Sequence, residues 1–476
     1  MHLTGDSDSG DPNAAYCLDG IYHLHYIVIH PWRGGGTGHV NGGKKSLSFI
    51  HVSSPDMLHW TWQPTNLQPS FTGHGVASGT GFMTKEGRPA AIYAGLGDPH
   101  HSYITVATDN QLSAWEKPYP VMPTGGPDGG MTLTSGPDCF LVGDTYYAYS
   151  KTQDYMVCKS TDLVNWTYVG PLMKHELPEV AMGEDIGTAN MFQLGDRWML
   201  LCISHEMGCR YYLGDWDEDA EQFVPKSHGR MNWRRPDQSL IDPRYRDFFA
   251  PESLLTADGR RVMWGWIATA DPSIDGKKVQ SLPRELSLTN DELRIHPLRE
   301  LESLRYDAAV FDDIVLTPAA GERFTISNIT DLEGDAFEIR VSVDRAEIER
   351  KRFGFLLFAG GESDGLPVLF RPESGTICVG KTEAPFAVAD LPNDEDMDLR
   401  IYVDKYLVEV FVNGRQALLS THMNYRDGSA LEAYLYGVAV RVPPMTIRKV
   451  EIWKLKPTNQ RFFEARENPV WKPDEK

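Results

Sequence analysis

A short turn that recurs five times constrains the fold of this chain more than any other feature of its sequence. Each copy places a glycine, usually beside an acidic residue, at the start of an alternating strand. The five copies are Leu18–Tyr22, Lys85–Arg88, Val142–Tyr147, Leu194–Trp198 and Ala257–Arg261. Gly-Asp and Asp-Gly pairs between strands of period two are hairpin signals. Because the copies lie roughly fifty to seventy residues apart, each repeat has room for one small antiparallel sheet.

A second pattern follows several of these turns and supports the same repeating unit. It joins a Ser, Thr or Asp to a later tryptophan in Ser54–Trp60, Thr108–Trp115 and Ser160–Trp166, and less closely in Gly214–Asp217. We expect the Asp or Ser side chain to cap a tight turn and the tryptophan to pack between sheets. Five similar sheets predict an all-β fold, with a five-bladed β-propeller over residues 1–295. A single large β-sandwich is the alternative.

The C-terminal part of the sequence has a different pattern. Pro297–Arg305 predicts a short helix with three leucines on one side, and we expect residues 296–308 to form a helical linker. Alternating strands follow at 336–343, 353–358, 399–404 and 407–412, and the last ends in an Asn-Gly turn. This spacing predicts a β-sandwich domain over residues 309–456 and a tail over residues 457–476.

Charge and composition narrow the class of partner. A formal net charge of -20 disfavours nucleic acid, whose binding needs a basic surface. The sequence has no apolar run of about eighteen residues and no basic-then-hydrophobic N-terminus, so we expect no membrane span and no signal peptide. The protein is then cytoplasmic, or secreted with its leader already removed. The six cysteines lack metal-type spacing, and we expect no metal ion and no cofactor. A neutral carbohydrate suits the acidic charge and the 12 tryptophans better.

The candidate catalytic residues lie just before the repeated turns, because the innermost strands of a propeller converge on a central funnel. These segments are Asp11–Asn13, Ser78–Thr80, Ser135–Asp138, Gly183–Asp185 and Phe249–Glu252. Among them Asp11 and Glu184 stand out. Glycoside hydrolysis needs two carboxyl groups flanking one bond, one ionised to attack and one protonated to assist the leaving group.

Each of these acidic residues also has a plainer interpretation. Asp11 could belong to an ordinary turn, Glu184–Asp185 could be an exposed acidic pair, and Asp138 could be a solubilising residue at a strand edge. The spacing of the acidic residues in Asp6–Asp11 also allows a calcium loop, but the glutamate that such a loop requires is replaced by Cys17.

Longer stretches of the sequence carry a family resemblance that covers nearly the whole chain. They are His2–Asn13, His51–Trp60, Ala77–Thr80, Asp247–Ser253, Gly259–Trp266, Leu282–Leu288 and Leu399–Arg415. The first looks like a segment ending in Asn-Asp-Pro-Asn-Gly, and the second is similar to His-Ala-x-Ser-x-Asp-Leu-x-His-Trp. Both motifs belong to the glycoside hydrolase family 32 fructosidases, which include invertases, inulinases and levanases.

This resemblance implies the same propeller and sandwich, and a glycosidase that retains the configuration of the fructose carbon. It implies that Asp11 is the nucleophile and forms a fructosyl-enzyme intermediate. Glu184 becomes the acid/base, with a pKa raised so that it can protonate the leaving oxygen. Asn13 is implied as a ligand of the sugar. The further substrate-binding candidates are Ser78, Asp185, Glu252 and Trp266.

Two departures from the family pattern affect the neighbours of the nucleophile. The residue before it is Gly10, where the family has Asn. The family's Arg-Asp-Pro, whose Asp stabilises the transition state, aligns on Ser135–Pro137, so that Gly136 stands in place of the acid. Asp138 lies two residues further along the strand and therefore points to the same face. We expect Asp138 to take over this role imperfectly.

A third departure concerns the acid/base. The family's glutamate aligns on Gly187, so Glu184 must reach the site from three residues earlier. These changes favour a fructoside other than ordinary sucrose or inulin, and a fructan, a fructooligosaccharide, a sucrose-like fructoside and a difructose dianhydride are the candidates. Three other functions stay open: a fructosyltransferase with the same intermediate, a family 43 enzyme acting on arabinose or xylose, and a catalytically silent carbohydrate-binding relative.

Overall fold

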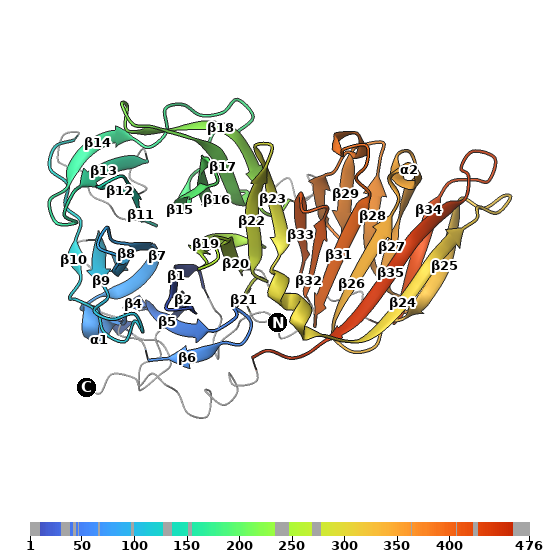
Figure 1. Ribbon diagram of the computed structural model, residues 1–476, viewed down its shortest axis with the longest axis horizontal. Helices are drawn as coiled ribbons and strands as arrows, with labels where there is room; N and C mark the ends of the chain where they lie inside the picture. Colours follow the sequence, from blue (N-terminus) through green and yellow to red (C-terminus); the bar gives the residue numbers. More distant parts are fainter. Residues whose placement is uncertain are drawn as a thin grey trace.

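The chain is nearly all β throughout its described residues. The computed structural model describes residues 10–29, 39–40, 44–45, 47–64, 67–96, 100–126, 136–150, 155–233, 247–268, 278–362, 364–405, 407–421 and 427–459. In these ranges helix is confined to α1 (Pro69–Thr72), α2 (Arg345–Ile348), and the 3-10 segments η1 (Arg299–Leu304) and η2 (Val388–Asp390). Five small sheets lie around a common centre, and two larger sheets lie beside them (Figure 1).

Each of the five N-terminal sheets, I to V, is antiparallel. Sheet I has the order β1 (Pro12–Leu18), β2 (Ile21–Ile29), β5 (Leu47–Ser54), β6 (Thr61–Gln63). Sheet II has the order β7 (Gly75–Met83), β8 (Pro89–Leu96), β9 (His101–Val106), β10 (Tyr119–Pro120). Sheet III has the order β11 (Asp138–Val142), β12 (Thr145–Ser150), β13 (Met156–Ser160), β14 (Thr167–Pro171). Sheet IV has the order β15 (Gly187–Leu194), β16 (Arg197–Ser204), β17 (Gly208–Asp217), β18 (Gln222–Arg230). Sheet V has the order β19 (Phe249–Leu255), β20 (Arg261–Ile267), β22 (Arg284–Thr289), β23 (Glu292–Pro297), with β21 (Val279–Gln280) paired to β20. A separate short ladder joins β3 (His39–Val40) to β4 (Lys44–Lys45).

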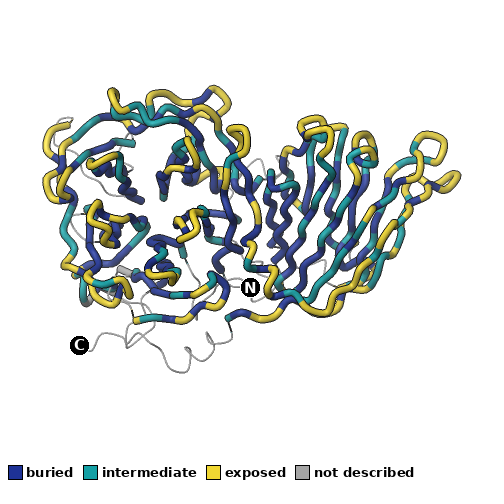
Figure 2. Tube along the Cα trace, in the orientation of Figure 1, coloured by how far each residue is buried: buried dark blue, intermediate teal, exposed yellow. Residues whose placement is uncertain are grey.

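The five repeated turns join the first two strands of the five sheets, as the sequence predicts. They connect β1 to β2, β7 to β8, β11 to β12, β15 to β16 and β19 to β20. Each contains a glycine with positive φ, for example Gly20 at 79° and Gly259 at 83°, a conformation that costs glycine little. The first strands of the sheets meet at the centre (Figure 1), and exposed residues gather at the turns (Figure 2).

The Asp-to-tryptophan pattern forms the expected capped turns. The Asp56 carboxylate accepts hydrogen bonds from the backbone N–H groups of Leu58 and His59, at 3.0 and 2.8 Å. Asp162 repeats this arrangement in sheet III, and Asp109 accepts backbone N–H groups in sheet II. The tryptophans that follow are at most 6% exposed and pack in the hydrophobic cores: Trp60, Trp115 and Trp166. The sequence prediction for these turns is confirmed.

The predicted helix after sheet V is the 3-10 segment η1, and its three leucines, Leu298, Leu301 and Leu304, are buried. Two six-stranded sheets follow. The first has the order β24 (Arg305–Leu316), β35 (Met445–Leu455), β26 (Ala336–Val343), β31 (Met397–Asp404), β32 (Leu407–Val412), β33 (Gln416–Ser420). The second has the order β25 (Phe324–Asp331), β34 (Ala430–Tyr436), β27 (Arg352–Ala359), β28 (Leu366–Arg371), β29 (Thr376–Val379), β30 (Thr382–Pro385).

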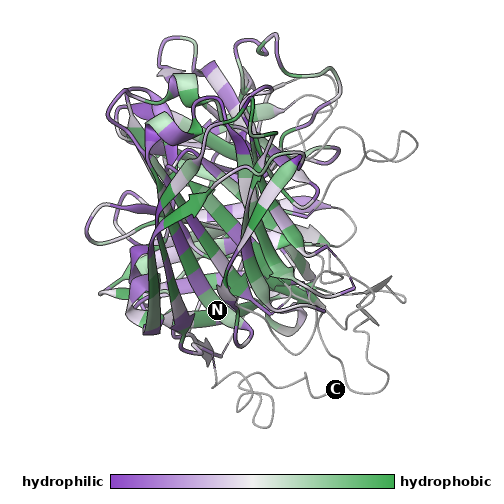
Figure 3. Cartoon of the chain, turned by 90° about the vertical axis from the view of Figure 1, so that its right-hand side faces the viewer, coloured by the Kyte–Doolittle hydropathy of each residue, from purple (hydrophilic) through white to green (hydrophobic). Residues whose placement is uncertain are grey.

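These two larger sheets share one hydrophobic core. Residues from both of them, such as Ile339 and Val410 in one and Phe355 and Val368 in the other, are fully buried in it. Hydrophobic and hydrophilic residues alternate along many of the strands (Figure 3), because successive side chains point to opposite faces of a sheet. The four strands that the sequence predicts here correspond to β26, β27, β31 and β32.

Candidate active site

Asp11 lies directly before β1, where the chain enters the centre of the five sheets. Hydrogen bonds between Gly10 N–H and Ile27 O (2.8 Å) and between Ile27 N–H and Asp11 O (2.9 Å) fix its backbone to β2. The Ser78 hydroxyl, from β7 of sheet II, donates to Asp11 Oδ2 at 2.5 Å. Burial raises the pKa of the Asp11 carboxyl, and the hydrogen bond from Ser78 acts in the opposite direction. Asp11 and Ser78, which come from two different sheets, are therefore in contact. The sequence predicts that both segments face the same central funnel.

Asn13 holds these two sheets in register. It is fully buried, and its amide group accepts a hydrogen bond from Gly79 N–H at 2.7 Å and donates one to Asp11 O at 2.5 Å. Its contact with a sugar stays a prediction. Gly10, directly before Asp11, packs closely against β2, because a Cβ on Gly10 would lie 3.1 Å from Ile27 Cβ. An asparagine at position 10 would therefore require Ile27 to shift.

Glu252, on β19, belongs to a buried polar network. Its Oε1 accepts hydrogen bonds from the Thr80 hydroxyl and from Ser253 N–H, both at 3.2 Å. Asn190 completes the network, because its Nδ2 donates to Thr80 Oγ1 at 3.1 Å and its Oδ1 accepts from Ser253 Oγ. Glu252 is fully buried, which raises its pKa well above the ordinary value. The hydrogen bonds of Glu252, Thr80, Asn190 and Ser253 join strands of three different sheets. Contact of Glu252 with substrate stays a prediction.

Asp138 is also buried, with 1% exposure, at the start of β11. Its Oδ2 accepts a hydrogen bond from Met191 N–H at 2.7 Å, and burial raises its pKa to about 7. At position 136, where the family pattern has an acid, this chain has glycine, and the backbone there cannot accept a side chain. Gly136 has φ of 49°, and a Cβ on it would lie 2.8 Å from Thr188 N, so the backbone leaves no room for a side chain. Ser135 lies outside the described residues, and transition-state stabilisation by Asp138 stays a prediction.

The raised pKa of Asp138 predicts a specific dependence of stability on pH. The native state keeps this proton up to about pH 7, whereas an ordinary aspartate loses it near 3.8, so stability falls as pH rises through that window. Asp138→Asn keeps an acceptor for Met191 N–H and removes the fall, which is on the order of 4 kcal/mol. We therefore expect the variant to gain stability over the wild type as pH rises, measured by urea unfolding at several pH values.

The difference between variant and wild type is the quantity to compare, because other buried groups act in the opposite direction. Burial lowers the pKa of His23 to about 4 and of His25 to about 3, and lowers that of His51 well below its ordinary value. These neutral histidines make stability rise with pH between about pH 4 and 6.5, which is most of the same window. A stability difference between Asp138→Asn and wild type that stays constant with pH would contradict the prediction.

The expectation that Glu184 has a raised pKa is wrong. Its carboxylate lies in the segment before β15, where Arg230 Nη2 is 2.7 Å from Oε1 and Arg210 Nη1 is 3.4 Å from Oε2. Burial alone would raise the pKa of Glu184, but the hydrogen bond and charge of Arg230 and the charge of Arg210 outweigh it and lower the pKa. Glu184 is therefore ionised at neutral pH. Its role as acid/base stays a prediction that these ion pairs do not support.

Asp185 does not form an exposed acidic pair with Glu184 but holds a histidine. His205 N–H donates to Asp185 Oδ1 at 2.7 Å, and His205 Nδ1 lies 2.5 Å from Asp185 Oδ2. Arg210 Nη2 fixes the Asp185 backbone by donating to its carbonyl oxygen at 2.9 Å. A Cβ on Gly187 would lie 3.0 Å from His205 Cε1. The imidazole thus stands where a side chain at position 187 would begin.

His205 belongs to the same site as Asp11, and the sequence interpretation missed it. The imidazole is close enough to Asp11 to lower the pKa of that carboxyl, although burial outweighs this effect. The available signal was the β15–β16 hairpin, whose register pairs Gly187 with Ile203 and so carries residue 205 back towards residue 185. Single-residue inspection does not show this, because the two partners are separated by 20 positions.

Trp266 lies near the end of β20 in sheet V. It pairs with Phe249 in the β19–β20 ladder, and the two rings have centroids 6.4 Å apart. The Phe249 ring in turn lies 5.7 Å from the His205 ring, edge to face. The buried Trp266 Nε1 has no hydrogen-bond partner among the described residues. Its contact with substrate stays a prediction.

The described residues hold no group of three or more His, Cys, Asp or Glu side chains that could bind a metal ion. Asp6 and Asp8 of the alternative calcium loop lie outside the described residues. None of the described helices is long and apolar enough to span a membrane.

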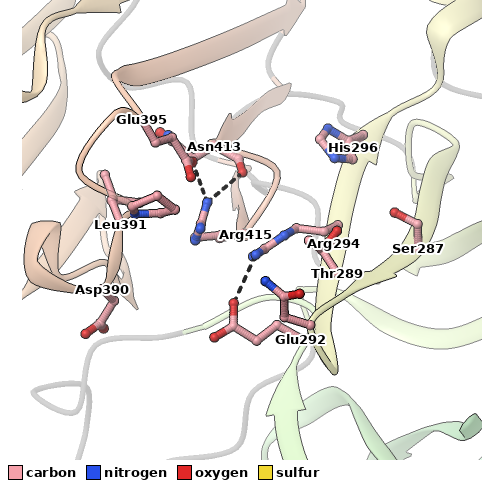
Figure 4. A pocket seen from close by; sticks show the side chains of 12 residues that line it. Ser287, Thr289, Glu292, Arg294, His296, Asp390, Leu391, Glu395, Asn413 and Arg415 are labelled. Carbon is pink, nitrogen blue, oxygen red and sulfur yellow. Dashed lines mark hydrogen bonds and ion pairs between the residues drawn. The ribbon is translucent and has the colours of Figure 1, made fainter.

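A separate pocket of about 530 Å³ lies between sheet V and the larger sheets (Figure 4). Four of its charged side chains form two ion pairs: Arg294 Nη2 is 3.0 Å from Glu292 Oε2, and Arg415 Nη1 is 2.5 Å from Glu395 Oε1. Its lining includes none of the predicted catalytic residues.

Comparison with known proteins covers both parts of the chain. The sequence model for the glycosyl hydrolases family 32 N-terminal domain matches residues 7–297, and that for the family 32 C terminal matches residues 300–454. Sucrose-6-phosphate hydrolase of Salmonella typhimurium is 25% identical over 86% of this chain and 85% of its own length. Levanase of Bacillus subtilis (strain 168) is 25% identical over 96% of this chain and 71% of its own length.

The solved structures agree on the fold. Fructan 1-exohydrolase IIa from Cichorium intybus has a TM-score of 0.71 at 16% identity, covering 100% of this chain and 98% of its own. Exo-inulinase from Aspergillus awamori has a TM-score of 0.71 at 17% identity, covering 96% of this chain and 98% of its own. Since the two family models together match nearly the whole chain, from the segment that carries Asp11 to the larger sheets, this protein is a glycosidase that belongs to glycosyl hydrolases family 32.

Proposed function

We propose that this glycosidase hydrolyses a fructoside by a retaining mechanism in which Asp11 is the nucleophile. One observation carries the proposal. The Asp11 carboxyl stands at the entrance of the central strands, held by Ser78 at 2.5 Å, in a chain of family 32. Relatives of the chain are named for the hydrolysis of sucrose-6-phosphate and of levan, which both contain fructose.

The proposal includes an assignment of the sheets to two domains. We take sheets I to V as the five blades of a β-propeller and the two larger sheets as a β-sandwich, with domain limits at 1–295 and 309–456 and a linker at 296–308. The first strands of the five sheets would then line one funnel with Asp11 at its mouth. The tail at 457–476 falls largely outside the described residues.

A retaining mechanism also needs a group that protonates the leaving oxygen and later activates water. The chain offers two candidates: Glu184, which the sequence favours, and the Asp185–His205 pair, whose imidazole is close enough to Asp11 to affect the pKa of that carboxyl. The steric closure at Gly10 and Gly136 changes the walls around the nucleophile, which supports a fructoside other than ordinary sucrose or inulin.

The test of the function is a panel of substrates. The purified chain is incubated with sucrose, inulin, levan and difructose dianhydrides, and released fructose is measured. We expect release from at least one of them. Sugar binding with no release from any substrate would contradict hydrolysis and would support the catalytically silent alternative.

A further inference from the structure

The family's glutamate aligns on Gly187 in this chain, and the imidazole of His205 lies beside that position. A Cβ at Gly187 would lie 3.0 Å from His205 Cε1 and 3.1 Å from Ile203 Cγ1, both on β16 or just after it. A side chain at position 187 would therefore press on the imidazole of His205 and on Ile203, which would have to give way by a few tenths of an ångström. The imidazole of His205 is thus a proton-transferring group that lies directly beside position 187.

The contacts of His205 give its ring a defined orientation. The Asp185 carboxylate can only accept hydrogen bonds, so His205 Nδ1 carries a hydrogen and donates it across 2.5 Å. The same carboxylate accepts the backbone N–H of His205 at 2.7 Å. His205 Nε2 has no hydrogen-bond partner among the described residues, and the side chain is 46% exposed. The second nitrogen is thus available to a ligand.

The Asp185–His205 pair is held in place by buried neighbours. Asp185 is only 13% exposed, and its carbonyl oxygen accepts a hydrogen bond from the fully buried Arg210. The preceding Glu184 is anchored by Arg230 and Arg210. In this arrangement the ion pairs of Glu184 fix the segment that presents Asp185, and Glu184 itself points towards arginines.

We propose that His205, oriented by Asp185, is the catalytic acid/base of this enzyme in place of the family's glutamate. The inference rests on the proposed function and specifies its proton-transfer group. His205 is a catalytic residue in this scheme because its Nε2 contacts the leaving oxygen. Asp185 is a positioning residue, which acts through the imidazole.

The proton and electron balance of the two steps is complete. In the first step an Asp11 oxygen bonds to the anomeric carbon, the bond from that carbon to the leaving oxygen breaks, and His205 Nε2–H gives its proton to that oxygen. In the second step a water oxygen bonds to the anomeric carbon, its proton passes to the neutral Nε2, and the ester bond to Asp11 breaks. Both side chains return to their starting states, as general acid-base catalysis requires.

The imidazole of His205 has one charged contact and several apolar neighbours. Asp185, from the segment before β15, holds Nδ1, and the charge of Asp11, from the segment before β1, lies within electrostatic range. The other neighbours, Ile203 and Phe249, are apolar. Asp185 therefore acts on the reaction by orienting the imidazole.

The test compares two leaving groups. A fructoside that the wild type hydrolyses needs protonation of an alkoxide, whereas fluoride leaves β-fructosyl fluoride with little help. His205→Gln should lose about 10²- to 10⁴-fold in kcat/KM on the fructoside, but only a few-fold on the fluoride. Asp185→Asn should lose less on the fructoside and should keep the same split between the two leaving groups, because Asp185 acts through the imidazole. His59→Gln is the matched control, because His59 also contacts an aspartate through Nδ1, at 2.7 Å from Asp56, in an exposed turn of sheet I.

The outcomes separate the two proposals. The leaving-group split in His205→Gln, with wild-type behaviour in His59→Gln, supports the imidazole as acid/base. The same split in Glu184→Gln, with His205→Gln unaffected, overturns it and leaves the proposed function intact. An equal loss of His205→Gln on both substrates also overturns it, because that pattern indicates a structural role. A wild type inactive on the fluoride and on every fructoside refutes the proposed function itself.

Discussion

Asp11→Asn is expected to lower kcat/KM for fructose release by about 10⁴- to 10⁶-fold, the scale of loss when one member of a catalytic group is removed while binding groups remain. Asparagine keeps the shape of the side chain and can still accept the hydrogen bond from Ser78. It cannot form the ester with the sugar. The loss should therefore appear in kcat, with the folded structure unchanged by circular dichroism and thermal unfolding.

A control from the same hairpin tests whether the loss is specific. Asp19 lies in the exposed β1–β2 turn, where it accepts a hydrogen bond from Asn110 Nδ2 at 3.0 Å. Asp19→Asn should keep wild-type activity. Activity of Asp11→Asn within ten-fold of the wild type would show that another group attacks the sugar.

The second large effect concerns the joint between the five sheets and the two larger ones. Arg284 of β22 and Glu409 of β32 are both fully buried and lie 2.7 Å apart. Glu409 Oε1 also accepts Leu282 N–H at 2.8 Å, and Arg284 Nη1 donates to Met231 O at 2.7 Å. Removal of one partner leaves the other charge buried, so Glu409→Ala should lower the free energy of unfolding by about 3–5 kcal/mol.

Urea unfolding measures this cost, with an exposed ion pair as the control. Arg88 and Glu116 are each nearly half exposed, and Glu116→Ala should cost no more than about 1 kcal/mol. Replacing both buried partners, in Glu409→Leu with Arg284→Met, should restore part of the loss because no unpaired charge remains. A cost below about 1 kcal/mol for Glu409→Ala would mean that water reaches this joint.

Local features of the fold could be predicted from the sequence, because their determinants lie within a few residues. The turns around Gly20 and Gly259 and the cap at Asp56 depend on backbone conformation and on neighbouring N–H groups. The alternation of apolar residues likewise placed β26 and β32. The pairing of Arg284 with Glu409 could not be predicted, since the two residues are 125 positions apart in different sheets.

The chemistry of the site was only partly predictable for the same reason. Asp11 is recognised from its own segment. The ionisation of Glu184 is decided by Arg210 and Arg230, whose charges come from β17 and β18. The importance of His205 depends on its contact with Asp185 across a hairpin. The ion pairs of Glu184 and the contact between His205 and Asp185 cannot be recognised from the sequence around Glu184 or around His205.

The most direct test of the account is the stereochemistry of transfer to methanol. With a fructoside substrate that the wild type hydrolyses, turnover in the presence of methanol should give methyl β-fructofuranoside beside free fructose, because methanol can replace water in opening an Asp11 ester with a second inversion. The anomer is identified by nuclear magnetic resonance. Methyl α-fructofuranoside as the transfer product would contradict a covalent intermediate on Asp11.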